Sequence, residues 1–389
     1  MRGDPADAPE TRDTHRVTAV YLPEIGFRPA GVRLVTPVRA SDGRRTLTLT
    51  DLIVTPQGTD LAYYLTGLNG DEGDEARREI IAVRNDGEQQ VVTQGPCLLK
   101  GADQRLLSRR ISSTKAIPPW TGPVGVSIEI GGVGDFLLDA QLTPFGPETA
   151  TPRRDVNASV THEGITVTVG GVGAAREETA IEIEAAVPHG ECCAGIGAYA
   201  GHRLGPTALT LRDESGRLYM ERWQEADGRY DHKTLALFQP VHPDARWLEL
   251  SVPYTYVEEQ ERTEAVDLPV TIPVDVRLGR YAIRMLGTAL VPGNPGERNP
   301  RSREAALAVD VDLGGWQGDR RLLWPGPALL DGDFCNLGFR TEPGIDMRQP
   351  EPAKRVVILG SRALTGKTLA FNRPLVQVRG PWRIPIPLA

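Results

Sequence analysis

Apolar and polar residues alternate along several short stretches of this chain. The clearest stretches are 45–50, 61–65 and 247–252. Successive side chains of a β-strand point to opposite faces, so this alternation places one set in a core and the other in solvent. The pattern therefore predicts β-strands that are each buried on one face.

Turn residues separate the apolar runs. Asp86-Gly87 and Ser215-Gly216 each stand between two such runs, which is a strong hairpin signal. The chain also holds 42 Gly and 32 Pro, spread along its length. Both residues disfavour helices, so we expect helix only in two short segments, 71–78 and 103–110.

The same order of elements recurs along the chain. A strand pair at 43–67 and a hairpin near 80–87 are followed by a second strand pair at 164–185 and a second hairpin at 209–219. This spacing indicates a degenerate repeat of roughly 120–130 residues, the size of one domain. We predict an all-β protein with a disordered tail at 1–18 and β-sandwich domains at 19–150, 151–270 and 271–389.

Three segments carry a family resemblance. LTLRDESGRLY at 209–219, WLELSVP at 247–253 and GPWRIPIPL at 380–388 resemble the immunoglobulin-like domains in the extracytoplasmic part of bacterial anti-sigma-factor-like membrane proteins. The resemblance implies tandem immunoglobulin-like sandwiches and a place in the cell envelope. The family's sigma-binding segment and membrane helix have no counterpart in these residues, so no sigma-regulatory role is expected. In the last segment Pro stands at alternate positions, which is typical of an edge strand.

Charge and hydropathy exclude two classes of partner. The chain has 44 Lys and Arg against 51 Asp and Glu, a net charge of −7, whereas nucleic-acid binding needs a basic face. No apolar run approaches the roughly 18–20 residues that span a bilayer. The polar start of the chain lacks the apolar core of a secretory signal. We expect a soluble chain, and both the cytoplasm and the cell envelope stay open as locations.

One group of His and Cys residues is a candidate metal site, made of His189, Cys192, Cys193 and His202. Thiolate and imidazole are ligands that zinc prefers. However, adjacent residues in an extended chain point in opposite directions, so a loop with one buried thiol and exposed histidines is the alternative. The acidic loop 69–75 is a candidate for calcium, although Ile80 stands where an EF-hand has its last Glu. No other cofactor is expected.

Signatures of common enzymes are missing. The chain contains no G-x-S-x-G and no H-E-x-x-H motif. The segment 356–368 resembles a phosphate loop, but Gly360 and Gly366 are one residue too far apart and no helix is expected after them. The Gly-rich segments 131–134 and 170–173 lack the third Gly of a dinucleotide fingerprint, so we expect bends between strands there.

The six tryptophans divide into two sets. Trp120, Trp247 and Trp382 lie in or beside predicted strands, and we interpret them as core anchors. The other three lie near loops, where they are candidates for contact with a protein or glycan partner: Trp223, Trp316 and Trp324. We therefore expect a non-catalytic interaction or sensing module that binds through loops or strand edges. A carbohydrate-binding or carbohydrate-cleaving sandwich and a small zinc protein are the alternatives.

Overall fold

The structure is a computed structural model. It describes residues 19–23, 26–68, 76–98, 106–197, 209–222, 233–292, 305–329, 339–342, 352–359 and 368–388. Within these ranges the chain forms antiparallel β-strands and no α-helix, so the predicted all-β class is confirmed. None of the described residues forms a helix that is long and apolar enough to cross a membrane. The chain divides into two compact units, Met1–Arg153 and Arg154–Ala389.

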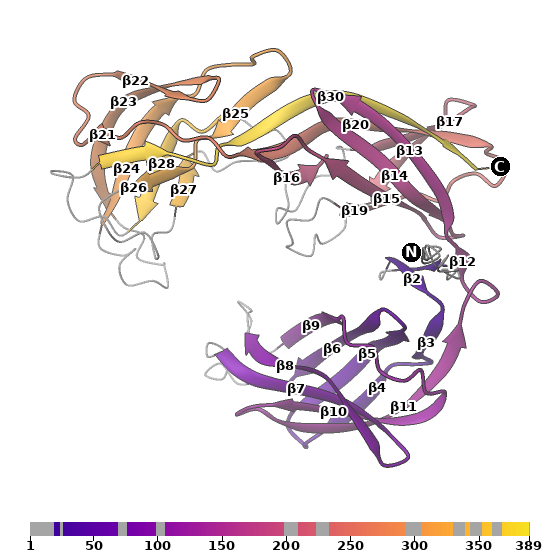
Figure 1. The fold of residues 1–389 in the computed structure, drawn as a ribbon. Helices are drawn as coiled ribbons and strands as arrows, with labels where there is room; N and C mark the ends of the chain where they lie inside the picture. Colours follow the sequence, from indigo (N-terminus) through magenta and orange to yellow (C-terminus); the bar gives the residue numbers. More distant parts are fainter. Residues whose placement is uncertain are drawn as a thin grey trace, which may run out of the picture. The chain divides into compact units, whose positions relative to one another are not determined.

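The first unit is built mainly on one nine-stranded sheet (Figure 1). Its strand order is β8-β7-β10-β11-β3-β5-β6-β9, and β4 pairs with β5 off this path. The strands are β3 (Gly31–Leu34), β4 (Val38–Ser41), β5 (Thr46–Thr55), β6 (Gly58–Thr66), β7 (Ala76–Asn85), β8 (Glu88–Leu98), β9 (Leu106–Ser113), β10 (Gly122–Ile130) and β11 (Gly134–Phe145). A small sheet adds β12 (Thr151–Pro152), β1 (Ala19–Leu22) and β2 (Gly26–Pro29).

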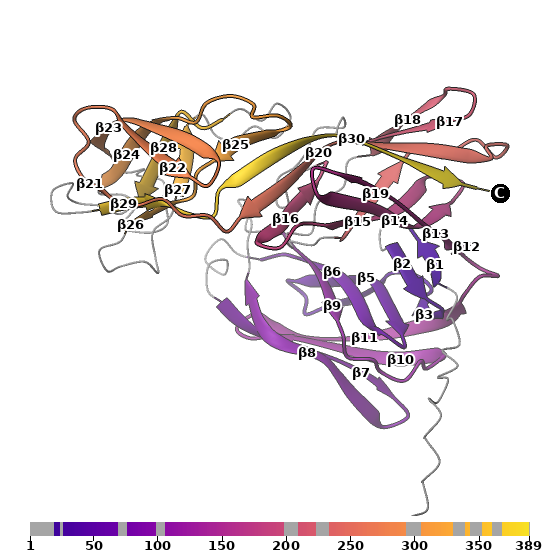
Figure 2. The ribbon, with the colours of Figure 1, turned by 45° about the horizontal axis from the view of Figure 1, so that its top comes forward.

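This sheet folds over to enclose its own core. Figure 2 shows β5, β6 and β9 in one layer and β7, β8 and β10 in the other. Leu47 and Leu61 of the first layer belong to the same buried cluster as Ile81 and Val126 of the second. Near the two outer strands, the Ser113 hydroxyl donates to the Val92 carbonyl oxygen at 2.9 Å. The first unit is therefore a sandwich-like or barrel-like layer pair made from one sheet.

A ten-stranded sheet dominates the second unit. Its order is β13-β14-β15-β19-β18-β17-β20-β30-β25, and β16 pairs with β20. The strands are β13 (Arg154–His162), β14 (Ile165–Ala174), β15 (Thr179–Ala186), β16 (Glu191–Ile196), β17 (Thr210–Asp213), β18 (Leu218–Arg222), β19 (Lys233–Phe238), β20 (Trp247–Glu259), β25 (Arg320–Trp324) and β30 (Leu375–Pro387). The sheet folds over so that Ile165 and Val167 of β14 share a core with Leu250 of β20 and Ile384 of β30.

Two smaller sheets complete the second unit. One has the order β21-β29-β26 and the other β22-β23-β24-β28-β27. The strands are β21 (Val266–Asp267), β22 (Val274–Leu278), β23 (Tyr281–Pro292), β24 (Ala305–Asp312), β26 (Pro327–Leu329), β27 (Phe339–Glu342), β28 (Arg355–Leu359) and β29 (Thr368–Phe371). Most of their buried residues belong to the same cluster as those of the ten-stranded sheet, whereas Ala306, Ala308 and Val357 form a small cluster of their own. The predicted boundary at 270/271 lies inside this unit, and the three-domain division remains a prediction.

The predicted turns and helices have different outcomes. Both hairpins are confirmed, and at the first one Asp86 and Gly87 have φ values of 47° and 84°, as a tight two-residue turn requires. The described parts of the two predicted helices, 76–78 and 106–110, are strands of β7 and β9, so the helix prediction is wrong there. Pairing with neighbouring strands outweighs the weak local preference in these charged segments.

The two Gly-rich segments have different structures. Residues 131–134 form the expected bend between β10 and β11. By contrast, 170–173 is not a bend between strands, because it continues β14 with a register shift between Val169 and Gly171. A glycine inside a strand commonly marks such a bulge.

Tryptophan burial corrects one prediction. Trp382 is fully buried and Trp120 is half-buried against the first core, but Trp247 is 42% exposed. Along the first half of β20 the buried side chains are Leu248, Leu250 and Val252, and Trp247 points to the opposite face. Trp247 is therefore not a core anchor.

The C-terminal half of β30 is an edge, as its prolines predict. In the described part of the chain, 382–387 pairs only with β20. The Leu388 N–H donates to the Arg246 carbonyl oxygen at 2.8 Å, and N–H direction alternates along a strand. Pro385 and Pro387 therefore turn their nitrogens, which carry no hydrogen, toward the open side.

Candidate functional site

Three of the four candidate zinc residues, His189, Cys192 and Cys193, lie on or just before β16. Cys192 is exposed and Cys193 is buried, and burial raises the pKa of the Cys193 thiol. His189 is exposed in the preceding turn, and His202 lies outside the described residues. Among the residues that the structure describes, no three or more His, Cys, Asp or Glu side chains form a group that could hold a metal ion. The proposed calcium loop 69–75 also lies outside the described residues.

The three candidate contact tryptophans have different surroundings. Trp223 lies outside the described residues. Trp324 is half-buried and packs against the core of the second unit. Trp316 is also half-buried, but the guanidinium carbons of Arg321 and Arg379 lie 4.8 and 4.7 Å from its ring centroid. Trp316 thus combines partial exposure with two charged neighbours.

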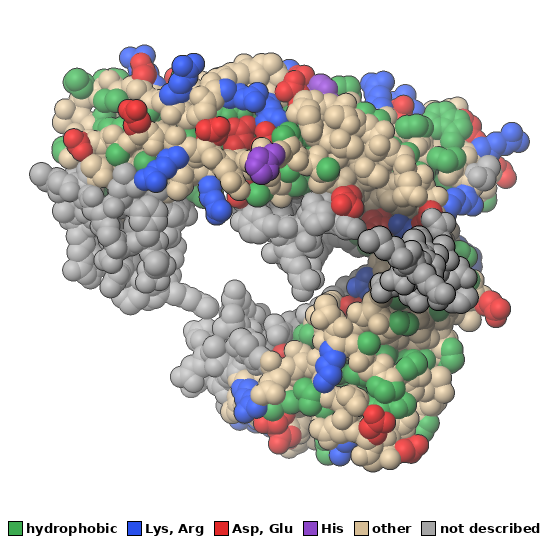
Figure 3. Space-filling view, viewed as in Figure 1, with side chains coloured by type: hydrophobic (Ala, Val, Ile, Leu, Met, Phe, Trp, Pro, Cys, Tyr) green, Lys and Arg blue, Asp and Glu red, His purple; other side chains and the backbone are tan. Residues whose placement is uncertain are grey.

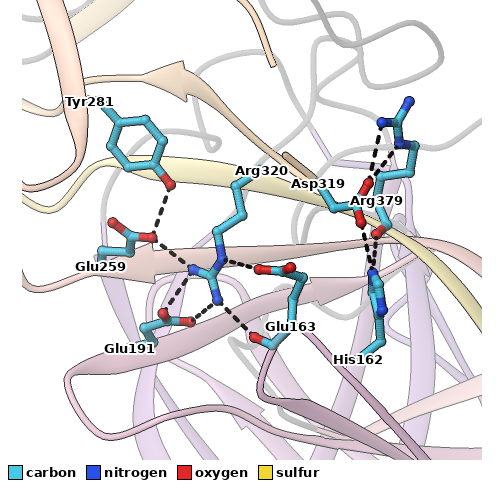
Figure 4. A network of polar contacts seen from close by, with 8 residues as sticks. All are labelled: His162, Glu163, Glu191, Glu259, Tyr281, Asp319, Arg320 and Arg379. Carbon is cyan, nitrogen blue, oxygen red and sulfur yellow. Dashed lines mark hydrogen bonds and ion pairs between the residues drawn. The ribbon is translucent and has the colours of Figure 1, made fainter. Parts of the chain in front are cut away.

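A buried arginine, Arg320, follows Trp316 by four residues and organises a network of charges. The register of β16 and β20 sets Glu191 directly opposite Glu259. Two like charges in such a pair repel each other. Arg320 of β25 lies between them, and its Nη1 donates to Oε1 of each glutamate at 2.8 Å (Figure 4).

Further contacts complete this network. Arg320 Nη2 donates to the Glu163 carbonyl oxygen at 3.1 Å, and the Glu163 carboxylate lies 3.6 Å from Nε. The Tyr281 hydroxyl donates to Glu259 Oε1 at 3.0 Å. The network thus ties the turn after β13 to β16, β20, β23 and β25.

The protonation of this network is that of a structural ion-pair cluster. Burial by itself would lower the pKa of Arg320, but the hydrogen bond to Glu191 and the charges of Glu191 and Glu259 outweigh it, so the pKa is raised. Burial, followed by the charge of Glu259, raises the pKa of Tyr281. Neither group exchanges a proton near neutral pH, and Arg320 is only 2% exposed. We therefore assign the network to holding strands together.

A second, more exposed set of contacts adjoins the network. Arg379 Nε and Nη2 lie 3.3 and 3.2 Å from Asp319 Oδ1. His162 Nε2 lies 3.3 Å from Asp319 Oδ2 and 3.1 Å from the Arg379 carbonyl oxygen (Figure 4). These contacts position Arg379 against Trp316. We call Trp316, Arg321 and Arg379 the Trp316 surface.

Arg321 is fixed by a separate chain of contacts. Its Nη2 donates to Gln377 Oε1 at 2.8 Å, and Gln377 Nε2 donates to the Tyr256 hydroxyl at 3.3 Å. Gln377 and Tyr256 are each 1% exposed. Both guanidinium groups that flank Trp316 are therefore held by neighbouring side chains.

Two carboxyl groups on the β17–β18 hairpin have shifted pKa values. Hydrogen bonds from the Ser215 and Tyr219 side chains lower the pKa of Asp213 to about 2. Burial raises the pKa of Glu221 to about 7, although the Leu209 N–H partly opposes this at 3.3 Å. Asp213 closes its turn by accepting hydrogen bonds from the backbone N–H groups of Ser215 and Arg217, so we assign it a structural role.

Sequence reasoning missed Arg320, Glu191 and Glu259. One local signal existed, because Arg320 stands two residues before Leu322 in a strand, which puts its charge on the same face as this apolar side chain. The Asp213 turn also had a signal, since Asp followed two residues later by Ser commonly closes a turn. No local signal pairs Arg320 with glutamates 129 and 61 residues away.

Comparisons with known proteins leave the family of this chain open. No protein-family model and no curated protein matches it. One solved structure, described as the conserved domain protein from Bacillus anthracis, aligns with 70% of this chain and 88% of its own length. The two are 13% identical, with a TM-score of 0.29. At that level the similarity supports no statement about family or function.

Proposed function

We propose that this chain is a non-catalytic binding protein made of tandem immunoglobulin-like sandwich domains, and that its Trp316 surface contacts a partner protein. The observation that carries the proposal is the half-buried Trp316 ring with two guanidinium groups within 4.8 Å of its centroid. Trp and Arg are the residues most enriched among those that dominate binding energy at interfaces.

Preorganisation supports the proposal. Asp319 holds Arg379, and Gln377 holds Arg321. Long side chains normally lose rotamer freedom when they bind, at a cost of roughly 0.5–1.5 kcal/mol each. Groups that are already fixed in the free protein avoid much of that cost.

Charge indicates the kind of partner. The Trp316 surface has two guanidinium groups, one of which is paired with the Asp319 carboxylate, in a chain whose net charge is −7. An exposed carboxylate on a partner would find two planar donors beside an aromatic ring, a geometry that arginine serves better than lysine. We therefore propose a partner protein with an acidic contact segment. The cell envelope, which the sequence resemblance implies, is part of the same proposal.

A capture experiment tests this function. The tagged full-length chain is the bait in an extract of the source cells, beside Arg321→Ala/Arg379→Ala and a matched control, Arg176→Ala/Arg277→Ala. Both control arginines are exposed and lie in the same unit. Thermal unfolding verifies that each bait is folded.

We expect a protein that the wild type and the control retain equally and that the double variant retains roughly tenfold less. Equal retention by all three baits, or no protein retained specifically by the wild type, would contradict the proposal. Retention of a glycan that is lost on Trp316→Ala would instead support the carbohydrate-binding alternative.

A further inference from the structure

A second surface of the second unit exposes apolar side chains on a regular sheet. Leu218 and Met220 of β18 are 50% and 38% exposed, and Trp247 of β20 is 42% exposed. Pro385 and Pro387 of β30 are exposed on the same sheet. Figure 3 shows hydrophobic side chains gathered where β17 and the end of β30 lie in Figure 1. Exposed apolar patches on a sheet commonly mark interaction sites.

The strand register aligns these residues in rows across four strands. One row runs Leu218, Arg212, Glu249 and Pro385, and Trp247 lies opposite Pro387 in the next. We call eight residues in these rows the β17–β30 face: Leu218, Met220, Arg212, Trp247, Glu249, Arg383, Pro385 and Pro387. Its charged members are Arg212 and Arg383, which are exposed, and Glu249, which is half-buried.

The edge beside this face is closed to strand addition. Pro385 and Pro387 turn their nitrogens to the open side of β30, as argued above, and a proline nitrogen has no hydrogen to donate. A partner strand would find two missing donors there. Strand addition is therefore disfavoured at this edge, and the face of the sheet is the surface left for a partner.

The face is complementary to itself. Arg212 and Glu249 are direct register partners on neighbouring strands. Consider a two-fold axis that runs parallel to β17 and β20 and lies above the gap between these two strands. Rotation about this axis sets Arg212 of each copy over Glu249 of the other. The same rotation sets Leu218 of each copy over Pro385 of the other, because these residues end the same row on opposite sides.

From this complementarity we infer that the β17–β30 face binds a second copy of this chain, in a two-fold, sheet-on-sheet dimer. Opposite charges meet at the centre of the contact, and apolar side chains meet on both sides of it. Trp247 is the largest exposed side chain of the face, and the same rotation sets it beside the end of β17 of the other copy. The Trp316 surface takes no part in this contact, so failure of the dimer test would leave the proposed partner binding at Trp316 unaffected.

Sedimentation velocity on the full-length chain at about 1–100 µM, a range that covers dimers of moderate affinity, tests the inference. The first variant is Trp247→Glu, and its matched control is Leu286→Glu on β23, whose side chain is 47% exposed outside the face. We expect a wild-type dimer, a dimer dissociation constant raised roughly tenfold or more in Trp247→Glu, and a control like the wild type.

A second test exchanges the charges of Arg212 and Glu249, so that the inference does not depend on the Trp247→Glu variant alone. Arg212→Glu sets Glu over Glu at the centre of the dimer and is expected to weaken it. Adding Glu249→Arg restores opposite charges and is expected to restore most of the affinity. A wild type that stays monomeric over the whole range, a Trp247→Glu variant that dimerises like the wild type, or a double exchange that restores nothing would overturn the inference.

Discussion

The indole nitrogen of Trp382 donates a hydrogen bond to the Ile165 carbonyl oxygen at 3.1 Å, although 217 residues separate the two in sequence. This bond joins β30 to the start of β14 and so crosses from one layer of the ten-stranded sheet to the other. The His162 ring meets the Trp382 ring edge-on, with centroids 5.3 Å apart. The C-terminal strand is therefore an integral part of the second unit.

We predict that Trp382→Ala destabilises the chain by about 3–5 kcal/mol, because it removes a fully buried aromatic side chain and leaves a cavity. Trp247→Ala is the matched control, since Trp247 is 42% exposed, and it is expected to cost less than about 1 kcal/mol. Denaturant unfolding of both variants measures the difference. Equal losses in the two variants would contradict this assignment of burial.

We predict that Arg320→Met costs about 3–5 kcal/mol, because it leaves the Glu191 and Glu259 carboxylates opposite each other without the cation that lies between them. Adding Glu191→Gln and Glu259→Gln removes the uncompensated charges and is expected to recover much of this loss. Arg277→Ala, at an exposed arginine, serves as the control. A stability loss in Arg320→Met no larger than in this control would show that the network is not structural.

The pKa of Asp213, held at about 2 against an ordinary value of 3.8, predicts an acid-dependent contribution. A lowered folded-state pKa contributes stability above the ordinary value, and this contribution is lost as the pH falls toward 2. The stability gap between the wild type and Asp213→Asn is therefore expected to be largest above pH 4 and to narrow toward pH 2. Thermal unfolding across this range tests it, with the exposed Asp139→Asn as control; a gap independent of pH would refute the prediction.

Glu221 predicts the opposite dependence, because burial raises its pKa from 4.5 to about 7. The folded state favours the protonated carboxyl, so the contribution is present below 4.5 and is lost as the pH rises through 7. Glu221→Gln keeps a neutral side chain at every pH and is expected to gain stability relative to the wild type as the pH rises from about 4.5 to 7. Thermal unfolding of both proteins at several pH values measures this. A difference in melting temperature that stays constant over that pH range would contradict the raised pKa of Glu221.

Much of the local fold was predictable from the sequence. Alternation in 45–50 and 247–252 is found in β5 and β20, and Asp86-Gly87 forms its hairpin. The prediction that Trp247 is a core anchor, based on its place in a predicted strand, is wrong, because the alternation of Leu248, Leu250 and Val252 puts it on the other face. Periodicity was the better guide to burial than residue type.

The charge network shows where prediction from one sequence ends. Arg320 meets Glu191 and Glu259 only because β16 pairs with β20, β20 with β30 and β30 with β25. Local patterns predict that strands exist but contain little information about which distant strands pair and in what register. The Trp316 surface was predictable only in part, since its tryptophan was a candidate contact residue and its two arginines were not.

The most direct test of the proposed function is the affinity of the captured protein for three forms of the full-length chain: wild type, Trp316→Ala and Trp247→Ala. Calorimetric titration measures all three. We predict that Trp316→Ala weakens binding about 30-fold or more and that Trp247→Ala stays within about threefold of the wild type, as expected if Trp316 is a main contact residue. Wild-type affinity in a folded Trp316→Ala variant would contradict the assignment of this surface to binding.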